Sequence, residues 1–460
     1  MHLAVITAGG AGMFCGSCLQ DNALARAWRA GGMEVSLIPT YTPLTLDTED
    51  ESAAGPAGGK VFLGGVNLYL EHKSKLWDRL PGFVHRAMDS AAVLKLSAKL
   101  GVSNDAADLG PLTVDLLRGE EGPQRRGIGE LVDWVTKLNP DAVLFSNALL
   151  VGPLRELRKR YRGPVWCTLQ GDDIFLNGLR EPHRSAALAM ICDRAGDPQT
   201  GFTGFLAHST YYADHMAELL GLDRDRFRVV PLLFDAAGVE NVEERAEKKK
   251  ADAPFTAGYF ARICPEKGLH DLVTAFQVFH DRRPASRLVV GGYLGPRDRR
   301  FWKKVRRDAA PLGDAFVHAG SPADAAAKHA LLSTFDVLSV PTTYREPKGL
   351  PVLEAWAHGV PCVQPAHGAF PELLGRVPGG VLVPPGDPLA LADALTELHD
   401  DPAKRHALGE AGRVGVREVH APAAVVGRVR AVLTGAADGE GASPHDGAET
   451  RGVSPGGGAV

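Results

Sequence analysis

Two glutamates, Glu346 and Glu354, flank the expected start of a helix at a spacing of eight residues. Residues 335–341 have the apolar pattern of a buried strand, and the loop after them leads to Pro351, which suits the first turn of a helix. A helix that begins at the carboxyl end of a parallel strand binds phosphate well, because its first backbone N–H groups are unpaired and its dipole is positive there. Carboxylates accept hydrogen bonds from paired sugar hydroxyls. The segment therefore predicts a site for a phosphate-linked sugar, with one glutamate on the sugar and the other on a ribose.

Glycines delimit the expected helix. Gly349 lies directly before it and has no Cβ to obstruct the close approach of a pyrophosphate. Gly359, followed by Pro361, predicts its end. Glu354 then lies about one turn into the helix, while Glu346 stays in the preceding loop.

Positive charge follows a second predicted strand, residues 255–260. Arg262 and Lys267 come directly after it, and both can reach one pyrophosphate, the arginine through its planar fork and the lysine as a point charge. Together they would stabilise the charge that develops as a glycosidic bond breaks. Taken without the Glu346 segment, both would be read as ordinary surface residues of a loop.

The first predicted strand is followed by a glycine-rich loop with the spacing Gly10-x-Gly12-x-x-x-Gly16. Such a loop can approach a phosphate, and a dinucleotide-binding site is one interpretation. The second strand, however, ends in Pro39-Thr40-Tyr41 without the acidic residue that would hold a ribose, which argues against a dehydrogenase. Cys15 and Cys18 form a lone CxxC in this region, for which we expect a local loop role and no metal site.

Polar residues also follow the predicted strand 165–169. Gln170 can donate and accept hydrogen bonds but cannot act as a general base. Asp172 and Asp173 can contact a sugar or an acceptor, or they can cap the helix that follows. Both interpretations stay open on the sequence alone.

Short apolar runs alternate with helical patterns along the chain, which predicts an α/β fold with two Rossmann-like domains, each built on a parallel sheet. The expected strands are residues 3–7, 34–39, 142–146, 165–169, 205–208 and 228–231, then 255–260, 287–291, 315–318, 335–340, 360–364 and 380–383. A charged stretch separates the two series. We expect an acceptor-binding domain at 1–235, a linker at 236–254, a nucleotide-sugar-binding domain at 255–415, a helix at 416–434 that packs back on the first domain, and a disordered tail at 435–460.

Composition limits the classes of function. The chain has 460 residues, 45% of them hydrophobic, and a formal net charge of -4, so it lacks the basic excess of a nucleic-acid binder. The N-terminus resembles a strand more than a signal peptide, and no run approaches the ~18 apolar residues that span a bilayer. We therefore expect a cytoplasmic protein with reduced cysteines. The segment 71–100 has the pattern of basic amphipathic helices, which favours packing on the sheet and leaves peripheral membrane contact open.

Several motifs in this order resemble the retaining glycosyltransferases of family 4, which have the GT-B fold. The resemblance implies that the parallel sheets of the two Rossmann-like domains face a cleft. The resemblance covers nearly the whole chain. Its motifs are Arg262-x-x-x-x-Lys267-Gly268, Glu346-x7-Glu354, Gly359-Val360-Pro361 and Gly368-Ala369-Phe370-Pro371-Glu372.

The resemblance implies a role for each of these positions. Arg262 and Lys267 would hold the donor diphosphate, Glu346 with the backbone of Gly349 and Leu350 would contact the donor sugar, and Glu354 would take the ribose. It also implies transfer with retention, without a metal or other cofactor, in which the departing phosphate helps to deprotonate the acceptor. The donor would be a nucleotide-linked hexose, and the acceptor is not specified.

This chain departs from the family pattern at three places. The family's paired glycines in the first loop are matched cleanly only by Gly16. Many members have a histidine where this chain has Gln170, and an aromatic residue where it has Lys348. Two alternatives stay open. A nucleotide-sugar 2-epimerase would share the two-domain architecture and use the same diphosphate site, and a non-catalytic protein that binds a nucleotide-sugar is suggested mainly by Gln170.

Overall fold

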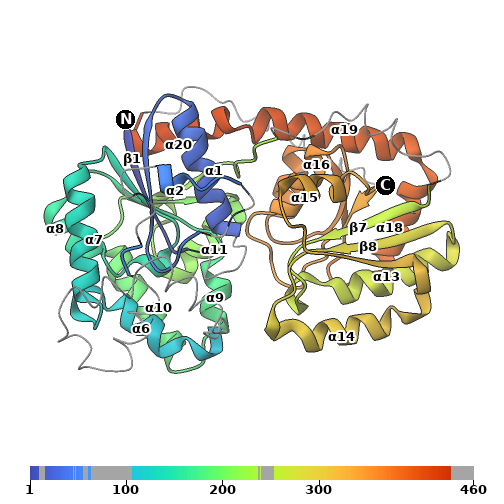
Figure 1. The fold of residues 1–460 in the computed structure, drawn as a ribbon, viewed down its shortest axis with the longest axis horizontal. Helices are drawn as coiled ribbons and strands as arrows, with labels where there is room; N and C mark the ends of the chain where they lie inside the picture. The colour runs from blue at the N-terminus through green and yellow to red at the C-terminus, as the bar shows by residue number, and fades with distance from the viewer. Residues whose placement is uncertain are drawn as a thin grey trace, which may run out of the picture.

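The computed structural model describes residues 1–9, 16–44, 46, 48–54, 58, 61–63, 106–236, 239 and 253–436. The predictions for the glycine loop with Cys15, for the segment 71–100, for most of the charged linker and for the tail after residue 436 lie outside these residues. The described chain forms two α/β units side by side, which we call the N-terminal and C-terminal domains (Figure 1).

The N-terminal domain is built on a six-stranded parallel sheet of order β2-β1-β3-β4-β5-β6. Its strands are β1 (His2–Thr7), β2 (Glu34–Pro39), β3 (Ala142–Phe145), β4 (Val165–Thr168), β5 (Gly204–Ala207) and β6 (Phe227–Val229). Its helices are α1 (Gly16–Ala30), α2 (Glu51–Ala54), α6 (Gly110–Leu117), α7 (Arg125–Leu138), α8 (Leu154–Arg160), α9 (Asp172–Gly178), α10 (His183–Gly196) and α11 (Thr210–Leu220).

The C-terminal domain has a second six-stranded parallel sheet, of order β12-β11-β10-β7-β8-β9. Its strands are β7 (Phe255–Phe260), β8 (Ser286–Gly291), β9 (Phe316–Gly320), β10 (Val337–Leu338), β11 (Cys362–Pro365) and β12 (Gly380–Val383). Its helices are α13 (Leu269–Arg282), α14 (Arg299–Asp308), α15 (Ala325–Leu332), α16 (Leu350–Ala357), α17 (Phe370–Arg376), α18 (Pro388–Asp400) and α19 (Pro402–Val419), and α20 (Pro422–Thr434) follows.

Short 3-10 helices connect several of these elements: η2 (Ala106–Asp108), η3 (Gly119–Glu121), η4 (Ala148–Leu150), η5 (Arg224–Arg226), η6 (Pro265–Lys267), η7 (Pro296–Asp298) and η8 (Ala310–Ala315). The predicted fold class is confirmed, and every predicted strand is present, some with ends shifted by a few residues. The largest difference is β10, which covers only Val337–Leu338 of the predicted 335–340. Its flanks still bond to β7, since Asp336 N–H donates to Thr256 O and Ser339 N–H donates to Gly258 O.

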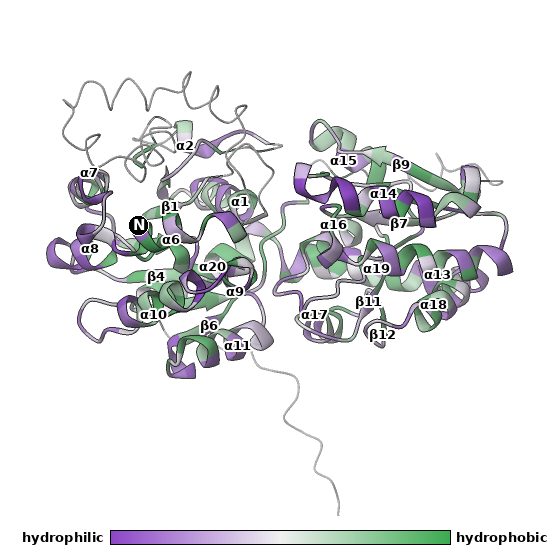
Figure 2. Ribbon diagram, turned by 90° about the horizontal axis from the view of Figure 1, so that it is seen from below, coloured by the Kyte–Doolittle hydropathy of each residue, from purple (hydrophilic) through white to green (hydrophobic). Residues whose placement is uncertain are grey.

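Buried strands explain why this sequence forms two-sided sheets. In β1, Ala4 and Ile6 belong to one hydrophobic cluster and Leu3 and Val5 to another, so alternate side chains enter the cores on opposite faces. Parallel sheets need such cover on both faces, and helices supply it here. Figure 2 shows the same pattern as apolar strands inside helices with polar outer faces.

The last helix returns to the N-terminal domain. Val425, Val429 and Leu433 of α20 lie in the cluster that holds Leu3 and Trp28. Helix α19 packs on α16, and the chain then passes to α20 beside α1 (Figure 1). The chain therefore crosses between the domains a second time at its end.

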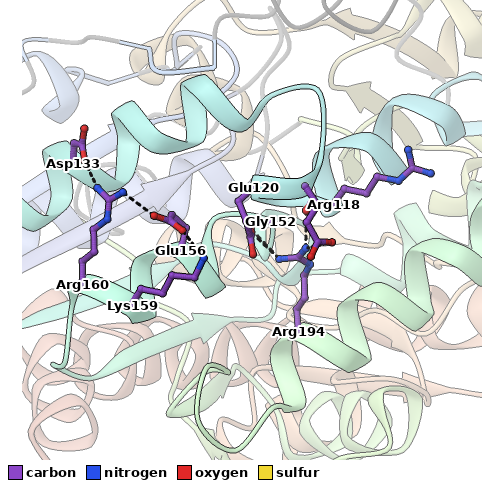
Figure 3. Close-up of polar contacts among 9 residues, drawn as sticks. Arg118, Glu120, Asp133, Gly152, Glu156, Lys159, Arg160 and Arg194 are labelled. Atoms are coloured by element: carbon purple, nitrogen blue, oxygen red, sulfur yellow. Dashed lines mark hydrogen bonds and ion pairs between the residues drawn. The ribbon is translucent and has the colours of Figure 1, made fainter.

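A polar network fixes the outer helices of the N-terminal domain (Figure 3). Arg194 of α10 is buried and lies 3.1 Å from the Glu120 carboxylate, and it donates to Arg118 O at 2.6 Å. On α8, the Glu156 carboxylate accepts from Lys159 at 2.8 Å and from Arg160 at 2.7 Å. A buried arginine with these partners ties α10 to η3, whereas the exposed pairs of α8 contribute little.

Each sheet reverses its strand order once, between β1 and β3 and between β7 and β10. Ligands of open α/β sheets bind at the carboxyl ends of the strands at such a reversal. The described part of the chain contains no helix that is both long and apolar enough to cross a bilayer.

Candidate active site at the C-terminal sheet reversal

The loops after β7 and β10 carry the predicted charged residues. These two strands are neighbours, with Val337 opposite Ala257 and Leu338 opposite Gly258, so their carboxyl ends lie together. The first loop carries Lys267 and the second carries Glu346, and the Lys267 ammonium lies 2.7 Å from a Glu346 carboxylate oxygen. The sheet order thus brings together two side chains that are 79 residues apart in the sequence.

Glu346 is buried and has three hydrogen-bond donors around it. Besides Lys267, the Tyr344 hydroxyl donates to Oε2 at 2.6 Å, and Gly349 N–H donates to Oε1 at 3.3 Å. Burial raises the pKa of Glu346, but the Lys267 charge and these hydrogen bonds outweigh it and lower the pKa to about 2. Glu346 is therefore ionised at neutral pH and can only accept hydrogen bonds.

Tyr344 was not singled out from the sequence. Its hydroxyl lies between the Lys267 ammonium at 2.5 Å and the Glu346 carboxylate. Burial and the Glu346 charge raise the pKa of Tyr344 well above its usual value, and the nearby Arg262 charge opposes this. A tyrosine in a polar loop has no periodicity that would identify it, so only its position in space reveals this role.

Acidification should remove the stabilisation that the charged Glu346 provides. Its pKa is about 2 in the fold against a usual 4.5. Since the unfolded chain takes up this proton first, the stabilisation is complete above pH 4.5 and is lost as the pH falls through 2. The full contribution is of order 3 kcal/mol. The difference in unfolding free energy between wild type and Glu346→Gln should therefore be constant near neutral pH and shrink under acid, as urea unfolding at a series of pH values would measure. A difference independent of pH would contradict this assignment.

Arg262 lies in the same loop as Lys267, with its side chain exposed. Its Nε donates to Cys264 Sγ at 3.4 Å, and within the described residues its guanidinium has no carboxylate as ion-pair partner. The backbone carbonyl of Arg262 accepts from the buried Tyr259 hydroxyl at 2.9 Å, which fixes the loop after β7. The Nε of Arg262 is thus held by Cys264, while its terminal nitrogens can bind an anion.

The helix predicted after Glu346 is α16, which begins at Leu350 and ends at Ala357, just before Gly359. Gly349 is its N-cap residue with a φ of 77°, a left-handed conformation that favours glycine. Glu354 lies inside the helix, buried, with its carboxylate 3.4 Å from the Lys328 ammonium of α15. The structure thus places Glu346 and Glu354 in separate ion pairs.

Gln170 meets the C-terminal domain. Its Nε2 donates to Asp21 Oδ1 at 3.0 Å and to Ser146 O at 3.1 Å, and its Oε1 accepts from Lys348 at 3.1 Å. Two of the three positions at which the sequence departs from the family pattern, Gln170 and Lys348, are therefore in direct contact. Asp21 was missed by sequence reasoning, although its place on the buried face of α1 was a possible signal.

Asp172 and Asp173 hold backbone and side chains within the N-terminal domain. Asp172 is buried and accepts from Ala148 N–H at 2.5 Å and Gln170 N–H at 2.8 Å, and burial raises its pKa to about 6 against these hydrogen bonds. Asp173 accepts from the Tyr212 hydroxyl at 2.6 Å. Helix α9 has Gly171 as its N-cap without a side-chain cap, so the capping interpretation of the two aspartates is wrong. They lie in the first turn instead.

Gly16 begins α1, and a Cβ on it would meet no atom within 4 Å. Cys18, the third residue of the same helix, is buried. Within the described residues, no group of three or more histidine, cysteine, aspartate or glutamate side chains is arranged to hold a metal ion.

Two further contacts join the domains beside the site. The Ser209 hydroxyl donates to Pro347 O at 3.0 Å, so the segment before α16 is held by the N-terminal domain as well as by its own loop. The Glu372 carboxylate of α17 accepts from Thr210 N–H at 2.6 Å, at the N-terminus of α11. A carboxylate is favourable at that helix end. The position of the Pro347–Lys348 segment therefore depends on contacts with both domains.

Comparison with known proteins gives the site a context. Residues 240–414 match the family model described as glycosyl transferases group 1. The chain is 32% identical over 201 residues to a 2-deoxystreptamine N-acetyl-D-glucosaminyltransferase of Streptomyces fradiae, which is 42% of this chain and 46% of that protein. It is 32% identical over 203 residues to a GDP-mannose-dependent alpha-(1-6)-phosphatidylinositol monomannoside mannosyltransferase of Mycolicibacterium smegmatis, or 42% and 49% of the two chains. The match thus spans about half the length of these relatives.

Solved structures extend the likeness to the whole fold. HepE of Anabaena in complex with UDP superposes with a TM-score of 0.63 at 16% identity, covering 95% of this chain and 100% of that one. Sucrose-phosphate synthase of Thermosynechococcus elongatus gives 0.68 at 17% identity, covering 95% and 98%. Residues 240–414 thus match the group 1 glycosyl transferases, and the chain as a whole has the two-domain GT-B fold.

Proposed function

We propose that this protein is a retaining glycosyltransferase that moves a hexose from a nucleotide-diphosphate sugar to an acceptor without a metal ion. The observation that carries the proposal is the ion pair between Lys267 and the buried Glu346 carboxylate at the sheet reversal, inside the segment that matches the group 1 glycosyl transferases. Solved structures of the same fold that hold UDP or UDP-glucose support a nucleotide-sugar as the donor.

The pair has capacity left for a ligand. A lysine ammonium has three N–H donors, and Glu346 and Tyr344 accept from it, so one donor stays available for a donor phosphate. Arg262 would hold the same diphosphate with its exposed guanidinium. The concentration of positive charge would stabilise the diphosphate as it leaves.

Glu346 would bind the transferred sugar. Its Oε2 is occupied by Lys267 and Tyr344, while Oε1 accepts one long hydrogen bond from Gly349 N–H and can accept another from a sugar hydroxyl. Gly349 and Leu350 lie at the N-terminus of α16, where their backbone N–H groups would contact the same ligand. Glu354 would accept from the ribose hydroxyls, which requires it to share or exchange its contact with Lys328.

The transfer step would proceed on one face of the sugar. The acceptor oxygen bonds to the anomeric carbon on the face from which the diphosphate departs, the bond from that carbon to the phosphate oxygen breaks, and the released phosphate oxygen takes the acceptor proton. No protein base is needed in this sequence. Gln170 fits it, because its amide cannot take a proton and instead links Asp21 to Lys348.

Donor screening by thermal shift tests the proposal. UDP-, GDP- or ADP-linked hexoses should raise the melting temperature of wild type, because a ligand that binds only the folded state stabilises it. Arg262→Ala and Glu354→Ala should each weaken that shift while the ligand-free proteins stay folded. If no nucleotide-sugar stabilises wild type, the proposal fails.

A second measurement separates transfer from the other reactions of a bound donor. Proton NMR of a stabilising nucleotide-sugar, incubated with the protein alone, should show slow release of the sugar with unchanged configuration at C2. Rapid exchange of the C2 configuration would identify an epimerase. A donor that binds but never turns over with any acceptor would indicate a binding protein.

A further inference from the structure

Helix α14 carries an unusual concentration of positive charge, on the outer edge of the C-terminal domain (Figure 1). Seven of the eight exposed residues in 296–307 are cationic, and Pro296 is the other. The seven are Arg297, Arg299, Arg300, Lys303, Lys304, Arg306 and Arg307, which we call the α14 basic face. The chain as a whole has a net charge of -4, so this excess is local.

The apolar residues on the opposite face of α14 are sufficient to explain why this helix folds, so the charges are not needed for its folding. Trp302 and Val305 are buried in the core of the C-terminal domain, and α13 packs beside them. Arg297 is paired with Glu266 and Asp298, and Arg307 with Asp308. The other five cations of the face have no ion-pair partner among the residues that the structure describes.

Unpaired like charges on one helix oppose its folding. Arg299 and Lys303, and likewise Arg300 and Lys304, lie four residues apart on adjacent turns, where like charges repel. Among the residues that the structure describes, no carboxylate forms an ion pair with any of these four cations to offset the repulsion. The arrangement is therefore better explained by a partner outside the chain than by stability.

We infer that the α14 basic face docks this protein on an anionic lipid bilayer. Six of the cations project along one side of α14, and Arg297 lies just before it in η7, an arrangement that suits a flat charged surface. In Figure 2 most of α14 is coloured as hydrophilic. Clusters of this size on a helix bind anionic lipid surfaces through the sum of many weak attractions. A hollow of about 500 Å³ lined by Trp302, Arg306 and His318 lies beside the face and offers room for a lipid headgroup.

A nucleic acid fits the same face less well. Proteins that bind single strands combine positive charge with exposed aromatic side chains on which bases stack. The exposed residues of 296–307 include no aromatic side chain, since Trp302 is buried and Phe301 is partly buried against the core. The exposed ring in the adjoining hollow, His318, already packs against Trp302 with ring centroids 4.4 Å apart. The negative net charge of the chain also opposes a long polyanion that extends beyond the helix.

Sedimentation of the full chain with vesicles tests this docking. Wild type should bind vesicles of phosphatidylcholine with phosphatidylglycerol and should dissociate from them when salt is added. It should not bind vesicles of phosphatidylcholine alone. The variant Arg300→Glu/Lys303→Glu/Lys304→Glu should lower the partition coefficient at least about tenfold. The control Arg417→Glu/Arg428→Glu/Arg430→Glu changes the net charge equally with exposed residues of α19 and α20, and should alter binding by less than about twofold.

Circular dichroism and the thermal shift with a nucleotide-sugar show whether each variant keeps the fold and the donor site. If the triple reversal fails to fold, Lys303→Gln/Lys304→Gln takes its place, with an expected loss of about threefold. Three results would overturn the inference. The first is wild type that fails to bind the anionic vesicles, and the second is an equal loss of vesicle binding in the α14 variant and its control. The third is binding of a single-stranded oligonucleotide that depends on α14, with no binding of vesicles. Each of these results can occur whether or not a nucleotide-sugar donor binds. Failure of the docking inference can therefore be distinguished from failure of the proposed glycosyltransferase function.

Discussion

Replacing Lys267 with methionine should lower the affinity for a nucleotide-sugar donor by about 10²- to 10³-fold, with a similar loss in the release of nucleoside diphosphate. The ammonium that would hold the donor phosphate is lost, and so is the cation that stabilises the buried Glu346 carboxylate. Without it, burial would push the pKa of Glu346 upward, and a protonated carboxyl accepts hydrogen bonds from sugar hydroxyls less well. Isothermal titration with UDP, GDP and their sugars would measure the first effect.

A matched lysine on the surface provides the control for this variant. The Lys404 side chain of α19 is 40% exposed and pairs with Glu397, so Lys404→Met removes a lysine–glutamate ion pair that is more open to solvent than the Lys267–Glu346 pair. It should bind the donor within about twofold of wild type, since exposed pairs contribute little. If Lys267→Met retains more than about a third of the wild-type affinity, Lys267 is not a phosphate ligand.

Gly268→Ala should lower the melting temperature of the C-terminal domain by about 10 °C. Gly268 has a φ of 70°, and a Cβ there would lie 1.7 Å from the backbone oxygen of Pro341. Backbone cannot swing aside as a side chain can, so the loop after β7 would have to move away from the loop after β10. That movement would also separate Lys267 from Glu346, and the variant should therefore lose donor binding together with stability.

A second left-handed glycine isolates the steric part of this effect. Gly386, between β12 and α18, has a φ of 68°, and a Cβ there would meet no atom within 4 Å. Gly386→Ala should therefore show only the cost of placing alanine in this conformation, about 1 to 2 kcal/mol, and a smaller shift in melting temperature. Equal shifts in the two variants, measured by calorimetry, would show that the contact between the two loops is not tight.

Much of the fold could be predicted from the sequence because its signals are local. Apolar runs such as 255–260 are buried strands in any arrangement, and Gly349, Pro351 and Gly359 mark the ends of α16 by their own backbone preferences. The chemical types in the site were recognisable for the same reason. Arg262, Lys267 and Glu346 follow strands, and charged residues after strands are candidates wherever the strands lie.

The partners in the site could not be predicted, because they depend on strand order and on packing between domains. Lys267 meets Glu346 only because β7 and β10 are neighbours. Tyr344 completes the cluster without any pattern in its surroundings. Gln170 and Lys348 are 178 residues apart and belong to different domains, so two apparently separate departures from a family pattern proved to be one contact.

The sequence by itself determined which residues could carry charge, and tertiary structure decided what that charge does. Glu346 and Asp172 are both carboxylic acids, both are buried, and both follow strands of parallel sheets. The pKa of Glu346 falls to about 2 because Lys267 offsets its burial, whereas the pKa of Asp172 rises to about 6 because burial prevails over its backbone N–H partners. Burial and a charged neighbour act in opposite directions, and which of them prevails depends on contacts that only the folded chain provides.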